Sequence, residues 1–198
     1  MPYSYTDTES MSGCPGVDYA NEPGGPKTYS MTRNLWQRMG RTIPERLWKS
    51  ILVNMPIACV DVIVHRRIKH QTRVLLGYRK IYPYRNRWAL PGGRIIKRET
   101  LCDTANRQLE EIGLRPTGKY RLVGVYPVNF KHRSDISICL SSYLPTPQEP
   151  QATRELSRYA WSPLNSLPPR LGSNYKAMLR DFKCRPPGAQ VTSTHYIG

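Results

Sequence analysis

A glycine turn followed by acidic residues is the segment of this sequence best suited to chemistry. Gly92 and Gly93 come first, and Arg107, Glu110 and Glu111 follow within one predicted helix. A glycine turn lets the backbone approach a diphosphate closely and offers a carbonyl to a metal ion. Carboxylates on the following helix can hold Mg²⁺ between the protein and the diphosphate oxygens. This order of residues suits metal-assisted chemistry at a diphosphate, but a glycine turn before a glutamate-rich helix is also a common surface element.

The segment 92–114, GGRIIKRETLCDTANRQLEEIGL, resembles the Nudix box, whose pattern is G-x5-E-x7-R-E-U-x-E-E-x-G-U with U aliphatic. One residue is missing between the two halves of the pattern, and Gln108 stands where the first glutamate of R-E belongs. A deletion of one residue turns the following side chains by ~100° around a helix. Glu111 nevertheless falls on a glutamate of the pattern when counted from either end. The matching residues are Gly93, Glu99 and Arg107 in the front half and Glu110, Glu111, Gly113 and Leu114 in the back half.

Within the Nudix family, the sequence is most similar to the GDP-mannose mannosyl hydrolases and other NDP-sugar hydrolases. The shared features are the G-G-R start at 92–94, Asp61 on the first strand and Arg79 at the end of the second strand. The resemblance covers roughly residues 43–165. It implies a Mg²⁺-dependent hydrolase of a nucleoside diphosphate linked to another group, most of all an NDP-sugar such as GDP-mannose.

The resemblance also implies roles for individual residues. Gly93, Glu111 and Glu155 would hold Mg²⁺, for which Mn²⁺ can substitute, while Arg79 and Arg94 would stabilise developing charge. Arginine and glutamate in the front half of the box would tie the loop to the helix. The branch has a histidine directly after its late metal ligand, where this chain has Leu156. The identity of the general base therefore stays open.

Several single residues have two interpretations. Asp61 interrupts an apolar run, where an unpaired buried carboxylate is costly, so it either acts in binding and catalysis or pairs with an arginine. Arg79 and Arg94 either clamp substrate through bidentate hydrogen bonds or lie solvated at the surface. Tyr84, in the cationic stretch 80–87, is a candidate for stacking on a nucleotide, or the stretch is a flexible loop over the entrance of the site. Glu110 either joins the metal site or faces solvent.

Among the four histidines, His132 is placed in the loop between two late strands, where it can replace the missing base.

The composition restricts the class of partner. The chain has 198 residues, with 30 Lys and Arg against 14 Asp and Glu, which gives a formal net charge of +16. Such a protein attracts nucleotides, nucleotide-sugars and RNA. No apolar run is long enough to cross a membrane, and five cysteines without a C-x-x-C pair argue against zinc. The first thirty residues fit neither a secretory signal nor a transit peptide, so we expect a cytoplasmic protein.

The elements that must position these residues follow from hydrophobic periodicity and turn signals. We expect a disordered tail at 1–31, a Nudix domain with an N-terminal helix at 32–183, and a flexible tail at 184–198. The first helix is predicted at 43–53, with a capping box of Thr42 and Glu45 and with Pro44 in its first turn. The pattern predicts an α+β fold, a Nudix-type α/β/α sandwich with a mixed central sheet. The other predicted elements are strands at 59–64, 72–78, 88–90, 120–129, 136–144 and 158–161, a turn at 66–71, and helices at 100–112 and 175–182.

Two alternatives to an NDP-sugar hydrolase remain. One is an RNA-binding or assembly protein on a Nudix scaffold with weakened catalysis, which Gln108, Leu156 and the basic charge favour. The other is an RNA 5′-pyrophosphohydrolase that combines the same metal site with the basic surface. The resemblance also leads us to expect a homodimer.

Overall fold

The computed structural model describes residues 43–184 and 190–191. The predicted tail 1–31 lies outside the described residues, as does the predicted tail 184–198 apart from positions 184, 190 and 191. None of the helices in the described ranges has the length and hydrophobicity to cross a membrane. The elements are α2 (Glu45–Asn54), β1 (Ile57–Ile68), β2 (Gln71–Arg79), β3 (Trp88–Ala89), β4 (Gly92–Arg94), α3 (Leu101–Glu111), β5 (Tyr120–Phe130), β6 (Arg133–Tyr143), β7 (Leu156–Pro163), α4 (Ser173–Cys184) and β8 (Gln190–Val191).

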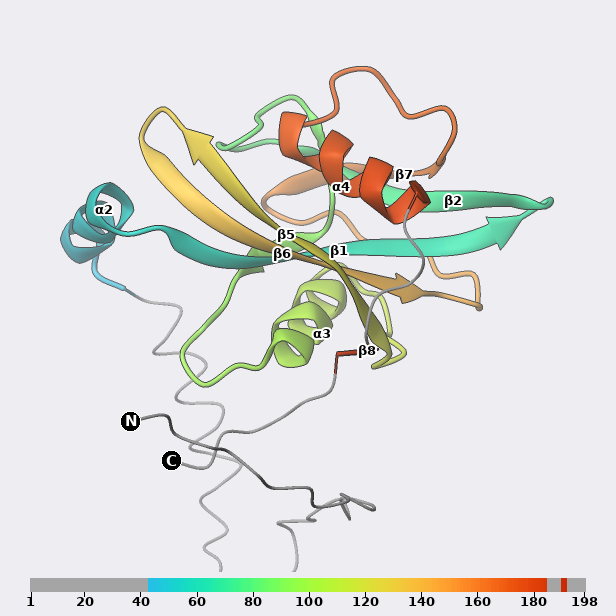
Figure 1. The fold of residues 1–198 in the computed structure, drawn as a ribbon, viewed down its shortest axis with the longest axis horizontal. Coiled ribbons are helices and arrows are strands. Elements are labelled where there is room, and N and C mark those ends of the chain that lie inside the picture. The colour runs from blue at the N-terminus through green and yellow to red at the C-terminus, as the bar shows by residue number, and fades with distance from the viewer. Residues whose placement is uncertain (1–42, 185–189, 192–198) are drawn as a thin grey trace, which may run out of the picture.

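A mixed sheet forms the middle layer (Figure 1). Its strand order is β3-β2-β1-β6-β5-β8, while β4 pairs with β1 and β7 pairs with β2. β1 runs parallel to β6 and antiparallel to β2 and β4. α3 packs on one face and α4 on the other, over two separate apolar clusters. The predicted sandwich with a mixed central sheet is confirmed.

The alternation of side chains along β1 explains the two clusters. Val60, Val62 and Val64 face the α3 cluster, whereas Ile63 faces the α4 cluster. Successive residues of a strand point to opposite faces, so a nearly continuous apolar run predicts a strand buried on both sides. Asp61 therefore interrupts a strand that is otherwise enclosed.

The hairpin between β1 and β2 is tighter than the sequence predicted. Ile68 pairs with Gln71, which leaves a two-residue turn, and both turn residues, Lys69 and His70, have positive φ angles of 47° and 63°. This is the type I′ geometry that matches the twist of paired strands. The predicted turn at 66–71 was too long because polar side chains were counted as loop although they continue the strands.

The helix α3, which carries the second half of the Nudix-like segment, begins and ends as expected. Thr100 caps α3 by accepting a hydrogen bond from the Asp103 amide, and Asp103 accepts one from the Thr100 amide in return. Gly113 follows the helix with φ +78°, a conformation that favours glycine.

Three other elements differ from the prediction. The helix α2 begins at Glu45 because Pro44, with ψ 138°, is extended and serves as the N-cap without a side-chain hydrogen bond. The predicted capping box and Pro44 in the first turn are therefore wrong, and Thr42 lies outside the described residues. The strand β4 was predicted as a turn, yet it pairs with β1. Positions 190–191 form β8 against β5 rather than a flexible tail.

Candidate active site

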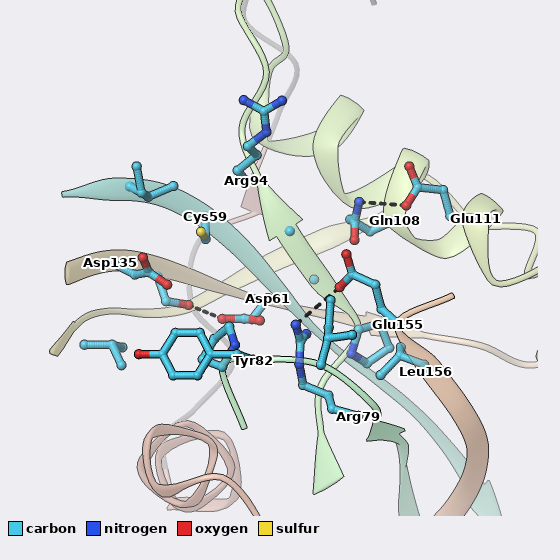
Figure 2. A pocket seen from close by; sticks show the side chains of 18 of the residues that line it. Cys59, Asp61, Arg79, Tyr82, Arg94, Gln108, Glu111, Asp135, Glu155 and Leu156 are labelled. Atoms are coloured by element: carbon cyan, nitrogen blue, oxygen red, sulfur yellow. Dashed lines mark hydrogen bonds and ion pairs between the residues drawn. The ribbon is translucent and has the colours of Figure 1, made fainter. Parts of the chain in front are cut away.

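A cavity of about 740 Å³ opens where β1, β4 and α3 meet the loop after β2 (Figure 2). It gathers most residues predicted for the site. The lining residues do not include Glu110 and Tyr84, which were predicted as a metal ligand and a substrate contact. The charged lining residues are Asp61, Glu111, Asp135, Glu155, Arg79, Arg94, Arg107, Arg133 and Arg154, and the aromatic ones are Trp48, Tyr82, Phe130 and Tyr175.

Arg107 fastens the segment that includes the glycine turn to α3. Its Nε donates to Glu99 Oε1 at 2.6 Å, while its Nη2 donates to Glu99 Oε2 at 2.8 Å and to the Arg94 carbonyl at 2.9 Å. Burial acts to raise the pKa of Glu99, but the hydrogen bonds from Arg107 and the Ile96 amide lower it below its ordinary value. The predicted tie between loop and helix is confirmed.

Gly93 lets β4 approach the helix α3. A Cβ at position 93 would lie 2.8 Å from Gln108 Oε1, closer than side chains tolerate. Gln108 in turn donates through Nε2 to Glu111 Oε2 at 3.2 Å. The amide therefore holds Glu111 in place while bringing no negative charge of its own.

Two carboxylates of the cavity can bind a cation. Glu111, with a side chain 43% exposed, lies 3.4 Å from Arg107 Nη1, and Glu155, 54% exposed, lies 3.3 Å from Arg79 Nη2. No cluster of three or more His, Cys, Asp or Glu is found within the described part of the chain. Mg²⁺ accepts one or two carboxylates and completes its shell with water and substrate phosphates. An all-oxygen set of Glu111, Glu155 and a glycine carbonyl fits that demand.

Glu110 is exposed and stays outside the cavity, because the helix turns it away from Gln108 and Glu111. The structure does not bring it to the predicted metal site. Its interpretation as a solvated residue agrees with this position.

Asp61 is 7% exposed and lies on the cavity wall. Its Oδ2 accepts a short hydrogen bond from Ser137 Oγ of β6. Burial raises the pKa of Asp61 to about 6, against the opposing effects of the Ser137 hydrogen bond and the Arg79 charge. The described residues give Asp61 no salt bridge, so its partner is a hydroxyl rather than the arginine proposed as the alternative.

The two predicted arginines occupy different parts of the cavity. Arg79 lies beside Asp61 and pairs with Glu155, and its buried Nε has no hydrogen-bond partner among the described residues. Arg94 points away from that group in Figure 2, and its guanidinium carbon lies 5.2 Å from the ring centre of Trp48 on α2. The structure therefore places Arg79 at the centre of the site and Arg94 on its α2 side.

The loop after β2 presents a different tyrosine from the one predicted. The hydroxyl of Tyr84 lies 3.0 Å from Ser173 Oγ, and its ring packs against Phe130 and Tyr175. Tyr82 is 55% exposed and lines the cavity. Tyr84 thus anchors the loop to α4, and Tyr82 lines the cavity where Tyr84 was predicted to do so.

Within the described part of the chain, no histidine lines the cavity to replace the missing base. Leu156 is 7% exposed and belongs to the apolar cluster under α3. His132 is exposed in the β5–β6 turn and does not line the cavity. The structure does not bring this predicted substitute to the site.

The sequence reasoning missed the contribution of β6. Arg133 donates to both oxygens of the buried Asp135 at 2.6 Å, and Ser137 bonds Asp61. These three residues alternate along β6 and share one face. The available signal was the spacing of two between Arg133, Asp135 and Ser137, which places them on one face of a strand.

Comparisons with known proteins agree with this fold. The NUDIX domain family model matches residues 55–182. The low-salt glycan biosynthesis protein Agl8 of Haloferax volcanii is 38% identical over 91 residues, which cover 46% of this chain and 56% of that protein. The chain therefore matches little more than half the length of this curated relative.

Three solved structures share the fold at low sequence identity. The NUDIX domain of Shewanella oneidensis NrtR, complexed with ADP ribose, has a TM-score of 0.58 at 20% identity, covering 74% of this chain and 95% of that one. The MutT protein of Methanosarcina mazei Go1 has a TM-score of 0.57 at 20% sequence identity, and the match covers 66% of this chain and 95% of that one. The C. elegans Ap4A hydrolase has a TM-score of 0.55 at 16% sequence identity, and the match covers 64% of this chain and 95% of that one.

Proposed function

Because this chain belongs to the Nudix domain family, we propose that it is a Mg²⁺-dependent hydrolase that cleaves an NDP-sugar such as GDP-mannose. The observation that carries this proposal is the single cavity that joins Gly93, Glu111 and Glu155 to Arg79 and Asp61. The naming of the relative Agl8 as a glycan biosynthesis protein supports a sugar-linked substrate. The nucleotide and the sugar are proposed on resemblance.

The carboxylate end of the cavity would bind the diphosphate. Glu111 and Glu155 would hold Mg²⁺, or Mn²⁺ in its place, and the bound ion would neutralise the diphosphate charge. Gln108 would keep Glu111 oriented, and Gly93 would let phosphate approach the backbone. Arg79 would donate hydrogen bonds to a phosphate oxygen, either after its ion pair with Glu155 breaks or while keeping that ion pair.

Asp61 is the group best placed to accept a proton in this cavity. With a pKa of about 6 it is mostly ionised at neutral pH and remains basic enough to take a proton from water or a sugar hydroxyl. Ser137 fixes the carboxylate by its hydrogen bond. In this proposal Asp61 does the work that a histidine at the position of Leu156 would do.

The experiment is product release from a panel of GDP-, UDP- and ADP-sugars, dinucleotides and 5′-triphosphorylated RNA, with Mg²⁺, Mn²⁺ or EDTA. We expect metal-dependent turnover of one sugar nucleotide. Glu111→Gln should lose at least a hundredfold in kcat/KM, while the matched control Glu110→Gln should stay within twofold of the parent. Equal activity of Glu111→Gln and the parent would refute the assignment of Glu111 as a metal ligand. The absence of product release from every substrate in the panel would refute the proposal that the protein is a hydrolase.

A second candidate is a Nudix-fold protein that binds RNA or assembles with it, either without hydrolysis or as an RNA 5′-pyrophosphohydrolase. Gln108 and Leu156, which replace a carboxylate and a histidine of the resembled pattern, favour the form without hydrolysis. Turnover of triphosphorylated RNA alone in the panel would select the pyrophosphohydrolase. No turnover of any panel substrate, together with an RNA affinity that falls steeply as the salt concentration rises, would support an RNA-binding protein without hydrolysis.

A further inference from the structure

A cluster of two arginines and a tryptophan lies on the sheet away from the cavity. It consists of Arg66 of β1, Arg73 of β2 and Trp161 of β7, and we refer to it as the Arg66–Arg73 cluster. Arg66 follows Val64 on the side of the sheet that carries α3, and Arg73 shares that side with Leu75. The cluster therefore continues the α3 face toward the β1–β2 hairpin, which projects from the sheet on the side away from α2 in Figure 1.

The two arginines face each other across the strand pair. Arg66 and Arg73 are direct partners in the antiparallel ladder, and like charges directly opposite each other are destabilising. The Arg66 guanidinium carbon lies 4.0 Å from the ring centre of Trp161, and Arg73 Nη1 donates to the Trp161 carbonyl at 3.2 Å. Trp161 thus holds two cations close together, Arg66 over its ring and Arg73 at its backbone carbonyl.

The cluster has hydrogen-bond donors without acceptors. The unsatisfied buried donors are Arg66 Nε and Nη1, Arg73 Nε and Trp161 Nε1. Within the described ranges, neither arginine forms an ion pair with a carboxylate. Native proteins rarely leave buried donors unpaired, so these donors favour an acceptor from outside the chain. These donor atoms are buried, but both arginine side chains as a whole are only half-buried, so a small shift of the side chains would bring the donors to a ligand.

We propose that the Arg66–Arg73 cluster binds a phosphate group at a second site, separate from the cavity. A phosphate supplies several acceptor oxygens to planar guanidinium groups and cancels the repulsion between them. None of the three residues lines the cavity, and Arg66 lies five strand residues beyond Asp61, which is roughly 16 Å. The site therefore does not belong to the catalytic centre.

The surrounding charge fits a phosphate-rich ligand. The sequence contains no acidic residue from 62 to 98, and four Arg or Lys fall between 66 and 73. The phosphate can come from a free pyrophosphate-bearing nucleotide or from the backbone of single-stranded RNA. The two sources share the chemistry that the cluster recognises, and separate titrations distinguish them.

The test is a titration of the full chain, in EDTA to suppress metal-dependent binding in the cavity. The ligands are inorganic pyrophosphate and a fluorescein-labelled 12-nucleotide oligouridylate. The Trp161 indole ¹H–¹⁵N resonance, assigned with Trp161→Phe, should move during the titration because its donor gains an acceptor. The Arg66→Gln, Arg73→Gln double variant should bind at least tenfold more weakly and show no such movement.

Arg67→Gln is the matched control, because Arg67 is exposed in the same hairpin but points to the opposite face. It removes one charge at the same place and should weaken binding by no more than twofold. Arg66→Lys, which keeps the charge without the planar group, should be intermediate. Thermal unfolding of each variant checks that it is folded.

Loss of pyrophosphate binding in the double variant would identify a small phosphate ligand, and loss of oligouridylate binding alone would identify the RNA backbone. The proposal is overturned if the parent binds neither ligand, or if the double variant matches Arg67→Gln. Because the titration measures binding without metal, a negative result would not contradict the proposed hydrolase. Likewise, a lack of hydrolysis in the substrate panel would not contradict the second phosphate site.

Discussion

Asp61→Asn should make the protein more stable at neutral pH while reducing its activity. Asp61 is 7% exposed, and burial raises its pKa from 3.8 to about 6. Between these two pH values the folded protein keeps a proton that the unfolded chain has released. The free energy of unfolding therefore falls as pH rises through this range. Asparagine keeps an acceptor for Ser137 and removes the buried charge.

The magnitude follows from the pKa. A rise from 3.8 to about 6 corresponds to roughly 3 kcal/mol, at about 1.4 kcal/mol for each pKa unit. The gain of Asp61→Asn over the parent should approach that value at pH 7.5 and nearly vanish at pH 3.5. Urea denaturation at several pH values between these limits measures it directly.

Asp135→Asn is the matched control for this prediction. Asp135 is also 7% exposed, but both of its oxygens accept hydrogen bonds from Arg133. Removing its charge leaves a partly buried guanidinium uncompensated, so this variant should lose stability at pH 7.5. The reasoning on Asp61 fails if Asp61→Asn is no more stable than the parent at pH 7.5, or if its gain is the same at every pH.

Three further substitutions test the site. Glu99→Gln should lower the free energy of unfolding by roughly 3 kcal/mol in urea titrations, because it leaves Arg107 without its buried partner; an unchanged midpoint would contradict this. Ser137→Ala removes the hydrogen bond that lowers the pKa of Asp61, so the acid limb of the kcat/KM profile should move to higher pH, and a fixed limb would argue against Asp61 as the base. Gly93→Ala should cost roughly 10²-fold in kcat with little change in unfolding, because its Cβ displaces the amide that orients the metal ligand; parental kcat would show that the close approach is dispensable.

The sequence predicted those parts of the fold that depend on local patterns. The apolar run of β1, the capping residue Thr100 and the terminal Gly113 each act on their own neighbours, so periodicity and turn chemistry were sufficient. The short strand β4 could not be predicted in this way. Its three residues become a strand only because β1, some thirty residues earlier, supplies the hydrogen-bonding partner.

The contrast between local patterns and long-range strand pairing also applies to the candidate site, where it separates the residues of β4 and α3 from those of β1 and β6. Gly93, Glu99, Arg107 and Glu111 lie within the continuous segment 93–111, which runs from β4 into α3, so their spacing alone predicts that they meet. Ser137 reaches Asp61 only because β6 pairs in parallel with β1, in a register that places Ser137 opposite Cys59. A shift of one residue would turn Ser137 to the other face of the sheet and leave the buried carboxylate without a donor. The pKa of Asp61, which burial raises and the Ser137 hydrogen bond lowers, therefore depends on the strand register. Variants that disturb the β1–β6 pairing should change the pH dependence of the proposed activity even when they leave the Nudix box intact.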